Sequence, residues 1–204
     1  MLMFTTLALS IVCLIDTPAP VPSYRQASTV VIIPIEGAVD NVTAHSFERR
    51  LKEASDADAV VIELNTPGGD LMSTLEICYQ IKNHAPSNTV AWINPHAFSA
   101  GTIIALACRD IIISEGGMFG DAAPINAMGV PLPDSERAKI ESPILAEVID
   151  SARRNHYDER LVEAFVSVGI ELWLINNIHT GERICINARE YETIFGKLSE
   201  KDII

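Results

Sequence analysis

Uninterrupted apolar runs of strand length recur along the chain, separated by segments in which apolar residues return every three or four positions. The first run, VVIIPI at 30–35, has the pattern of a strand that is covered on both faces. Further strands are predicted at 59–64, 90–93 and 111–114. These four runs indicate the strands of one sheet.

The intervening segments have the period of amphipathic helices. Phe47, Leu51 and Ala54 share one face of a segment at 42–54. Further helices are predicted at 71–81, after Ser99, from 135 onward and at 158–166. Strands and helices that alternate with short connections are typical of right-handed βαβ units. The fold class predicted is therefore α/β with a mostly parallel sheet.

Two later segments depart from this alternation. The stretch at 115–134 is rich in Gly and Pro, and so long an irregular segment within a domain is usually functional or mobile. Near the end, β-rich runs at 171–176 and 183–187 flank a turn with Thr180 and Gly181. This pattern predicts a C-terminal β-hairpin.

Composition narrows the function classes. The 204 residues are 48% hydrophobic, enough for one domain with a full core. A net charge of −12 without a basic run argues against nucleic acid as a partner. The four cysteines lack metal-ligand spacing and are predicted to be free, mostly buried thiols. The histidines are scattered and no phosphate-binding glycine motif occurs, so we expect neither a metal nor a cofactor.

The amino terminus differs from the rest of the chain. Residues 1–15 are apolar and uncharged, which fits a signal peptide or a membrane anchor. The tract at 16–28 reads as a linker, the folded domain spans 29–168, and 169–204 forms the hairpin extension. We expect the protein to be exported or membrane-anchored, with its body outside the cytoplasm, on the periplasmic side.

Ser99 is the first candidate for chemistry. It lies where an apolar strand gives way to a helix of small residues, so it is predicted at a helix start. Unpaired N–H groups and the positive end of the helix dipole favour negative charge there, which suits a nucleophile. The alternative is that Ser99 serves only as a helix N-cap.

A glycine loop follows the neighbouring strand. In α/β sheets functional loops lie at the carboxyl ends of strands, so TPGGD at 66–70 would place Gly68 and Gly69 beside Ser99. Backbone N–H groups of glycines can approach a bound oxygen and form an oxyanion hole. The alternative is a turn that merely reverses the chain.

A serine needs a base at neutral pH, and two residues come into question. His96 lies in what the pattern indicates is the loop before Ser99, where three positions leave little room to reach it. Lys139 begins the apolar stripe of the helix after the irregular stretch. In a dry pocket its amine could take the serine proton, but the pattern alone favours a solvated lysine.

Taken together, VVIELNTPGGD, SAGTIIALACRDIIIS, GDAAPI and a lysine 40 residues after the serine resemble a known family. This family is the membrane-associated serine proteases of the Clp-protease class, which are encoded with NfeD proteins and related to signal peptide peptidase A. The resemblance covers about residues 30–166 and implies a ClpP/crotonase-like fold.

The resemblance also implies roles. Ser99 would be the nucleophile and Lys139 the general base of a Ser-Lys dyad, without ATP or metal. Gly68, Gly69 and Ala100 would supply the oxyanion hole. Members tend to form homo-oligomers and to cut apolar segments of membrane proteins. The alternatives are a non-catalytic scaffold domain on the same fold and, further off, a crotonase-type acyl-thioester enzyme.

Overall fold

A parallel sheet forms the centre of the molecule. The computed structural model describes residues 26–125, 133–176, 180–181 and 183–196, so the leader and most of the linker predicted from sequence lie outside it. Four strands run side by side in chain order, and the fifth pairs with the end of the third. They are β1 (Val30–Glu36), β2 (Ala59–Thr66), β3 (Thr89–Phe98), β4 (Asp110–Ile113) and β5 (Met118–Gly120).

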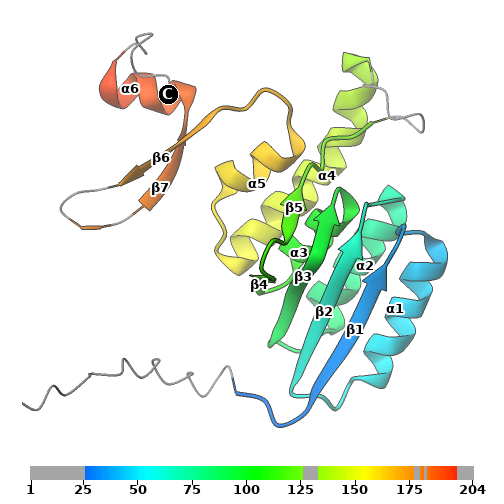
Figure 1. The fold of residues 1–204 in the computed structure, drawn as a ribbon. Helices are drawn as coiled ribbons and strands as arrows, with labels where there is room; N and C mark the ends of the chain where they lie inside the picture. Colours follow the sequence, from blue (N-terminus) through cyan, green and yellow to red (C-terminus); the bar gives the residue numbers. More distant parts are fainter. Residues whose placement is uncertain (1–25, 126–132, 177–179, 182, 197–204) are drawn as a thin grey trace, which may run out of the picture.

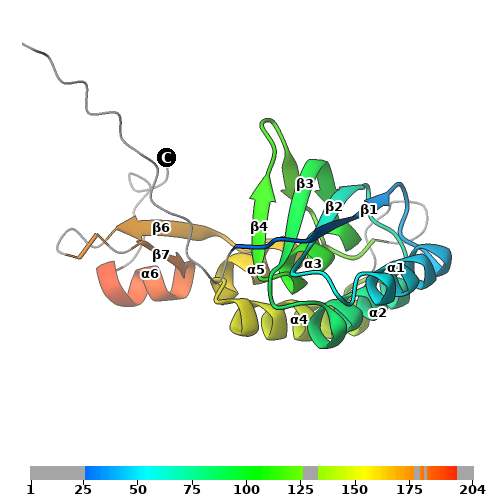
Figure 2. The same cartoon turned by 90° about the horizontal axis from the view of Figure 1, so that it is seen from below.

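Helices cover one face of this sheet, as Figures 1 and 2 show. Because the first four strands lie in chain order and their crossovers share one hand, every helix that connects two of them falls on the same side. The helices are α1 (Asn41–Glu53), α2 (Leu71–His84), α3 (Ala100–Ala107), α4 (Asp134–Asn155) and α5 (Glu159–Val166). The predicted α/β class and parallel sheet are confirmed.

The core lies between the sheet and these helices. Phe47 and Leu51 of α1, which the helical period singled out, are buried together with Ile33 and Ile35 of β1. Each such side chain stabilises the fold by about 1.5–3 kcal/mol when it leaves water. The amphipathic pattern of α1 therefore fixes which of its faces meets the sheet.

The opposite face of the sheet is open. Val30 and Ile32 of β1 are 50% and 55% exposed, and Ile112 of β4 is 56% exposed. The prediction that the first strand is covered on both faces is therefore wrong. The apolar run reflects a strand whose second face meets no other part of the described chain, because the sequential strand order sends all crossovers to one side.

The predicted hairpin is confirmed, with a helix that the sequence pattern did not reveal. β6 (Leu172–Asn176) and β7 (Arg183–Asn187) are antiparallel, and α6 (Ala188–Phe195) follows at once. Asn187 and Glu190 form a capping box that starts this helix. This group lies to one side of the main body (Figure 1). Arg160 of α5 forms an ion pair with Glu190 of α6.

The cysteines follow the prediction in part. Cys78 and Cys108 are buried free thiols, whereas Cys185 is half-buried and Cys13 lies outside the described residues. Burial raises the pKa of both Cys78 and Cys108, so these thiols are unreactive core residues. Within the described ranges, none of the helices combines the length and apolar character that crossing a bilayer needs.

Candidate active site

Ser99 lies on a sharp bend between β3 and α3. Its backbone has φ 51° and ψ −113°, a conformation that costs an ordinary L-residue free energy and that clusters at functional sites. Ser99 occupies the N-cap position, yet its side chain makes no capping hydrogen bond. Helix capping therefore does not explain why a serine stands here, and its hydroxyl is not used to cap α3.

The backbone around Ser99 is fixed from both sides. The Ser99 N–H donates to the carbonyl of Gly120 at the end of β5, at 3.0 Å. The Ser99 carbonyl in turn accepts the N–H groups of Thr102 and Ile103 in the first turn of α3, at 3.0 and 3.2 Å. These bonds hold the residue in its strained conformation.

Gly68 lies directly against Ser99, which confirms the predicted adjacency of the two strand ends. A Cβ built on Gly68 would come within 2.6 Å of the Ser99 Cβ and 3.0 Å of its Oγ, closer than real contacts allow. Gly68 also has φ +110°, a conformation that favours glycine. Only glycine at this position lets the loop approach the serine.

Gly69 is required for a different contact. A Cβ there would lie 2.0 Å from the carbonyl oxygen of Val39, in the loop after β1. The Val39 N–H donates to the Gly68 carbonyl at 2.9 Å, and its carbonyl accepts from Asp70 at 2.7 Å. The glycine pair thus seats the loop between Val39 on one side and Ser99 on the other.

The three predicted oxyanion donors are not equivalent. The Gly68 N–H donates to Oγ1 of buried Thr66 at 3.0 Å. Across the described part of the chain, the N–H groups of Gly69 and Ala100 have no acceptor. Ala100 is the first residue of α3, so its N–H adds to the positive end of the helix dipole. Gly69 and Ala100 are the amides that can take an anionic oxygen without breaking a bond.

Lys139 lies in the second turn of α4, shortly after the segment 126–132 outside the described residues. Its side chain is exposed, and nothing in the described ranges forms a hydrogen bond or ion pair with it. The pairing of Lys139 with Ser99 therefore stays a prediction.

His96 is part of β3, whose pairing with β5 extends to Phe98, so the loop expected there is absent. Its ring stacks on that of Phe98, with centroids 5.5 Å apart. His96 is therefore a residue that packs against Phe98 on the open face of the sheet.

Two threonines and one strand near Ser99 were missed from sequence. Thr66 holds the glycine loop, and Thr102 contacts the ends of β3 and β5. A threonine in TPGG and another in SAGT carry no distinctive pattern, and β5 is three residues long within a glycine-rich stretch. Neither feature gives a periodic signal.

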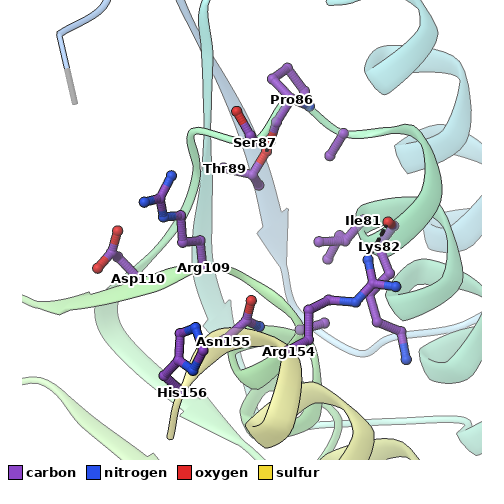
Figure 3. Close-up of a pocket in the computed structure, with 12 residues that line it drawn as sticks. Ile81, Lys82, Pro86, Ser87, Thr89, Arg109, Asp110, Arg154, Asn155 and His156 are labelled. Atoms are coloured by element: carbon purple, nitrogen blue, oxygen red, sulfur yellow. Dashed lines mark hydrogen bonds between the residues drawn. The ribbon is translucent and has the colours of Figure 1, made fainter. Parts of the chain in front are cut away.

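A hollow of about 560 Å³ lies at the other end of the sheet, where α2, α3 and α4 end (Figure 3). Lys82 is held there by Glu147 and Asp150, each at 2.8 Å. Arg154 points toward α2 and donates to the Lys82 carbonyl at 2.7 Å, the dashed line in Figure 3. Lys82 and Arg154 thus lie at the carboxyl ends of α2 and α4, where positive charge stabilises a helix.

The described residues include no cluster of metal ligands at either end of the sheet. Within the ranges that the structure describes, no three His, Cys, Asp or Glu side chains lie close enough to hold an ion. The groups that the structure places at this point are the Ser99 hydroxyl, the backbone of the glycine loop and the amino end of α3.

The sequence of this chain is similar to those of a known family and of several curated proteins. The family model described as NfeD1b, N-terminal domain, matches residues 29–197, a range that includes the hairpin. The chain is 32% identical over 148 residues to membrane protein NfeD1b of Bacillus subtilis, which covers 72% of this chain and 33% of that protein. It is 26% identical over 174 residues to membrane-bound protease PH1510 of Pyrococcus horikoshii, covering 80% and 38%. The chain thus spans about a third of the length of the curated relatives it matches.

Solved structures agree on the fold. A serine-to-alanine mutant of 1510-N, described as a membrane-bound stomatin-specific protease, matches with a TM-score of 0.60 at 22% identity, covering 83% of this chain and 77% of the other. A lysine-to-alanine mutant in complex with a substrate peptide also scores 0.60 at 22% identity, covering 83% and 73%. ClpP1 of Listeria monocytogenes scores 0.50 at 14% identity, covering 88% and 95%. These likenesses confirm the predicted Clp-like fold.

Proposed function

Since this chain belongs to the family of NfeD1b N-terminal domains, we propose that it is a serine endopeptidase domain that acts without ATP. The observation that carries the proposal is the contact of Gly68 with a strained Ser99 whose hydroxyl caps no helix. A nucleophile on a sharp strand-to-helix bend, beside uncommitted amides, is the arrangement that acyl transfer needs. The named activities of the relatives support the same reaction class.

Ser99 Oγ would attack the carbonyl carbon of a peptide bond while its proton passes to a base. The oxygen of the tetrahedral intermediate would lie against the N–H groups of Gly69 and Ala100, with Gly68 able to add a third if it leaves Thr66. Collapse of the intermediate releases the amine product, which takes the proton, and leaves an acyl group on Ser99. Water then hydrolyses that ester by the same path.

Lys139 is the proposed base, in a Ser-Lys dyad. A lysine can accept the serine proton only as the free amine, which requires a site that excludes water. Its exposure here means that bound substrate, or another copy of the chain, would have to cover it. Support comes from the 40-residue spacing after Ser99 and from the solved Pyrococcus mutants, which replace a serine or a lysine.

The substrate proposed is a polypeptide with an apolar segment from a membrane or exported protein. The names of the relatives place them at membranes, and one is described as specific for stomatin. We also propose that the chain works as a homo-oligomer, attached to the membrane or exported, with its body on the periplasmic side. No nucleic acid, metal or other cofactor enters this reaction.

A non-catalytic scaffold domain is the second candidate, and the exposed side chain of Lys139 favours it. In that case Ser99 would lack a base, and the glycine loop would only fix the ends of β1, β2 and β3. The two candidates differ in one measurable property, the reactivity of the Ser99 hydroxyl.

A fluorophosphonate probe measures that reactivity, together with cleavage of an apolar peptide. We expect the wild type to be labelled at Ser99, Ser99→Ala to take no label, and Lys139→Ala to react at least a hundredfold more slowly, because general-base catalysis contributes about 10²–10⁴-fold. Lys52→Ala, which alters an exposed lysine on α1, should match the wild type.

An unlabelled, folded wild type would support the scaffold instead. If Lys139→Ala reacts as fast as Lys52→Ala, the nucleophile stands but its base must be another residue.

A further inference from the structure

Thr102 joins the ends of two strands behind the nucleophile. Its side chain is fully buried, and its Oγ1 lies 2.8 Å from the Ala97 carbonyl oxygen of β3. The same atom lies 2.6 Å from the carbonyl oxygen and 2.8 Å from the nitrogen of Gly120 in β5. A hydroxyl carries one proton, so it donates to one of these carbonyls at a time while it accepts the Gly120 N–H.

The residues that Thr102 connects are those that hold Ser99. The Gly120 carbonyl accepts the Ser99 N–H, and the Thr102 N–H donates to the Ser99 carbonyl. Ser99 is therefore held on its amino side by Gly120 and on its carbonyl side by Thr102. The Thr102 hydroxyl closes the loop between these two contacts.

Gly120 would be weakly placed without this hydroxyl. β5 pairs with β3 over three residues, Met118–Gly120, and so short a strand has little hydrogen bonding of its own. Gly120 has φ +136°, which favours glycine, and a Cβ there would lie in ordinary contact with the Phe165 ring, at 3.5 Å. The position of its carbonyl thus depends on the bonds at its own N–H and oxygen.

We infer that Thr102 is a positioning residue for the nucleophile, an inference that rests on the proposed peptidase function. Its hydroxyl fixes Gly120, Gly120 fixes the amide of Ser99, and the strained backbone of Ser99 then aims Oγ at the substrate. Without the hydroxyl, the buried Gly120 N–H loses its acceptor and Ser99 relaxes toward an ordinary conformation. The effect acts on the chemical step, because Thr102 does not touch the substrate.

Thr102→Val removes the hydroxyl and keeps the shape, and Thr102→Ser keeps the hydroxyl. The matched control is Thr89→Val: Thr89 is also buried, and its Oγ1 donates to the Pro86 carbonyl at 2.6 Å, at the opposite end of β3. All variants are made in the full chain. Probe labelling rates at Ser99 and the kcat and KM for an apolar peptide are measured, with circular dichroism to verify folding.

We expect Thr102→Val to lower kcat and the labelling rate at least tenfold with little change in KM. Thr102→Ser should stay within about threefold of the wild type, and Thr89→Val should equal it, although both valine variants lose a buried hydrogen bond. If Thr102→Val does not fold, Gly120→Ala tests the same contact, because the alanine resists φ +136° and should slow labelling likewise.

Three results would overturn the inference while the wild type remains reactive. They are equal labelling of Thr102→Val and wild type, equal losses in Thr102→Val and Thr89→Val, and a loss in Thr102→Ser as large as that in Thr102→Val. Normal labelling of Gly120→Ala, where that variant is needed, would do the same. A wild type that does not react overturns the proposed function, and this inference falls with it.

Discussion

The two ends of the sheet use helix termini in opposite ways. At the carboxyl end of the strands, α3 begins, and its first N–H groups lie beside Ser99 and the glycine loop. At the amino end, α2, α3 and α4 finish, and Lys82, Arg154 and His156 surround a hollow of about 560 Å³ (Figure 3). This hollow therefore lies at the end of the sheet opposite Ser99.

The two ends differ in whether their polar groups already have partners within the described chain. Lys82 forms ion pairs with two carboxylates, and Arg154 donates a hydrogen bond to a carbonyl at the end of α2. Both cations therefore stabilise the fold. At the other end, the Gly69 and Ala100 N–H groups have no acceptor in the described chain. Satisfied groups stabilise a structure, and unsatisfied ones in fixed positions can bind a developing charge.

The largest effect that separates the two ends is expected from Gly68→Ala. The new Cβ would lie 2.6 Å from the Ser99 Cβ, and φ +110° would be strained. Moving a nucleophile by about 1 Å can cost 10²-fold in rate, so probe labelling should fall at least a hundredfold. Gly116→Ala is the control, because it has φ +74° but no heavy atom within 4 Å of its Cβ. Equal labelling of both variants would contradict the close contact.

Lys82→Met tests the other end and should act on stability alone. The Lys82 side chain is 10% exposed and holds Glu147, at 13%, as well as Asp150. Losing it leaves the Glu147 carboxylate without its cationic partner and with the Ser151 hydroxyl as a donor, so we expect the free energy of unfolding in urea to fall by about 2 kcal/mol. Lys52→Met, which breaks an exposed pair with Glu48, should lower the free energy of unfolding much less.

The labelling rate at Ser99 should be unchanged in the folded Lys82→Met protein. A loss of labelling as large as that of Gly68→Ala would mean that the two ends are coupled, and the contrast between them would not hold.

The smallest effect expected is the pH dependence of the same pair. The Lys82 hydrogen bond lowers the pKa of Asp150 below 3.8. Burial alone would lower the pKa of Lys82, but hydrogen bonds to Asp150 and Glu147 outweigh it and raise the pKa above 10.5. The stability from Asp150 is therefore complete above about pH 4 and is lost as the pH falls through the folded pKa.

Urea unfolding of Asp150→Asn and wild type between pH 3 and pH 7 measures this effect. Because Asp150 is mostly exposed, the two should differ by roughly 0.5 kcal/mol at pH 7 and converge toward pH 3. A difference that grows on acidification would have the wrong sign for a carboxyl group with a lowered pKa.

Residues of the site were predictable where a local pattern implied a position. The period of α1 and the apolar runs gave the sheet and its helices, and parallel strands with right-handed crossovers placed TPGGD and Ser99 at one edge. The contact between Gly68 and Ser99 follows from that topology. Thr66 and Thr102 were not predictable, because a threonine that binds backbone groups of another strand has no periodic signal in the sequence.

The open face of the sheet shows the same limit. The pattern of the run at 30–35 indicated a strand buried on both sides, whereas Ile32 is 55% exposed. Apolar residues along a strand indicate that both of its faces favour burial. They do not indicate which surface covers each face. The described chain supplies helices for one face only.

The sequence by itself determined the class of the fold, the edge of the sheet where Ser99 lies and the glycine loop beside it, because hydrophobic period and crossover handedness are local rules. The tertiary structure alone decided which amides lack an acceptor in the described chain and which threonines hold the loops. Those outcomes depend on hydrogen bonds between residues distant in the chain, such as Thr102 with Gly120, and each exists only once the strands have taken their places.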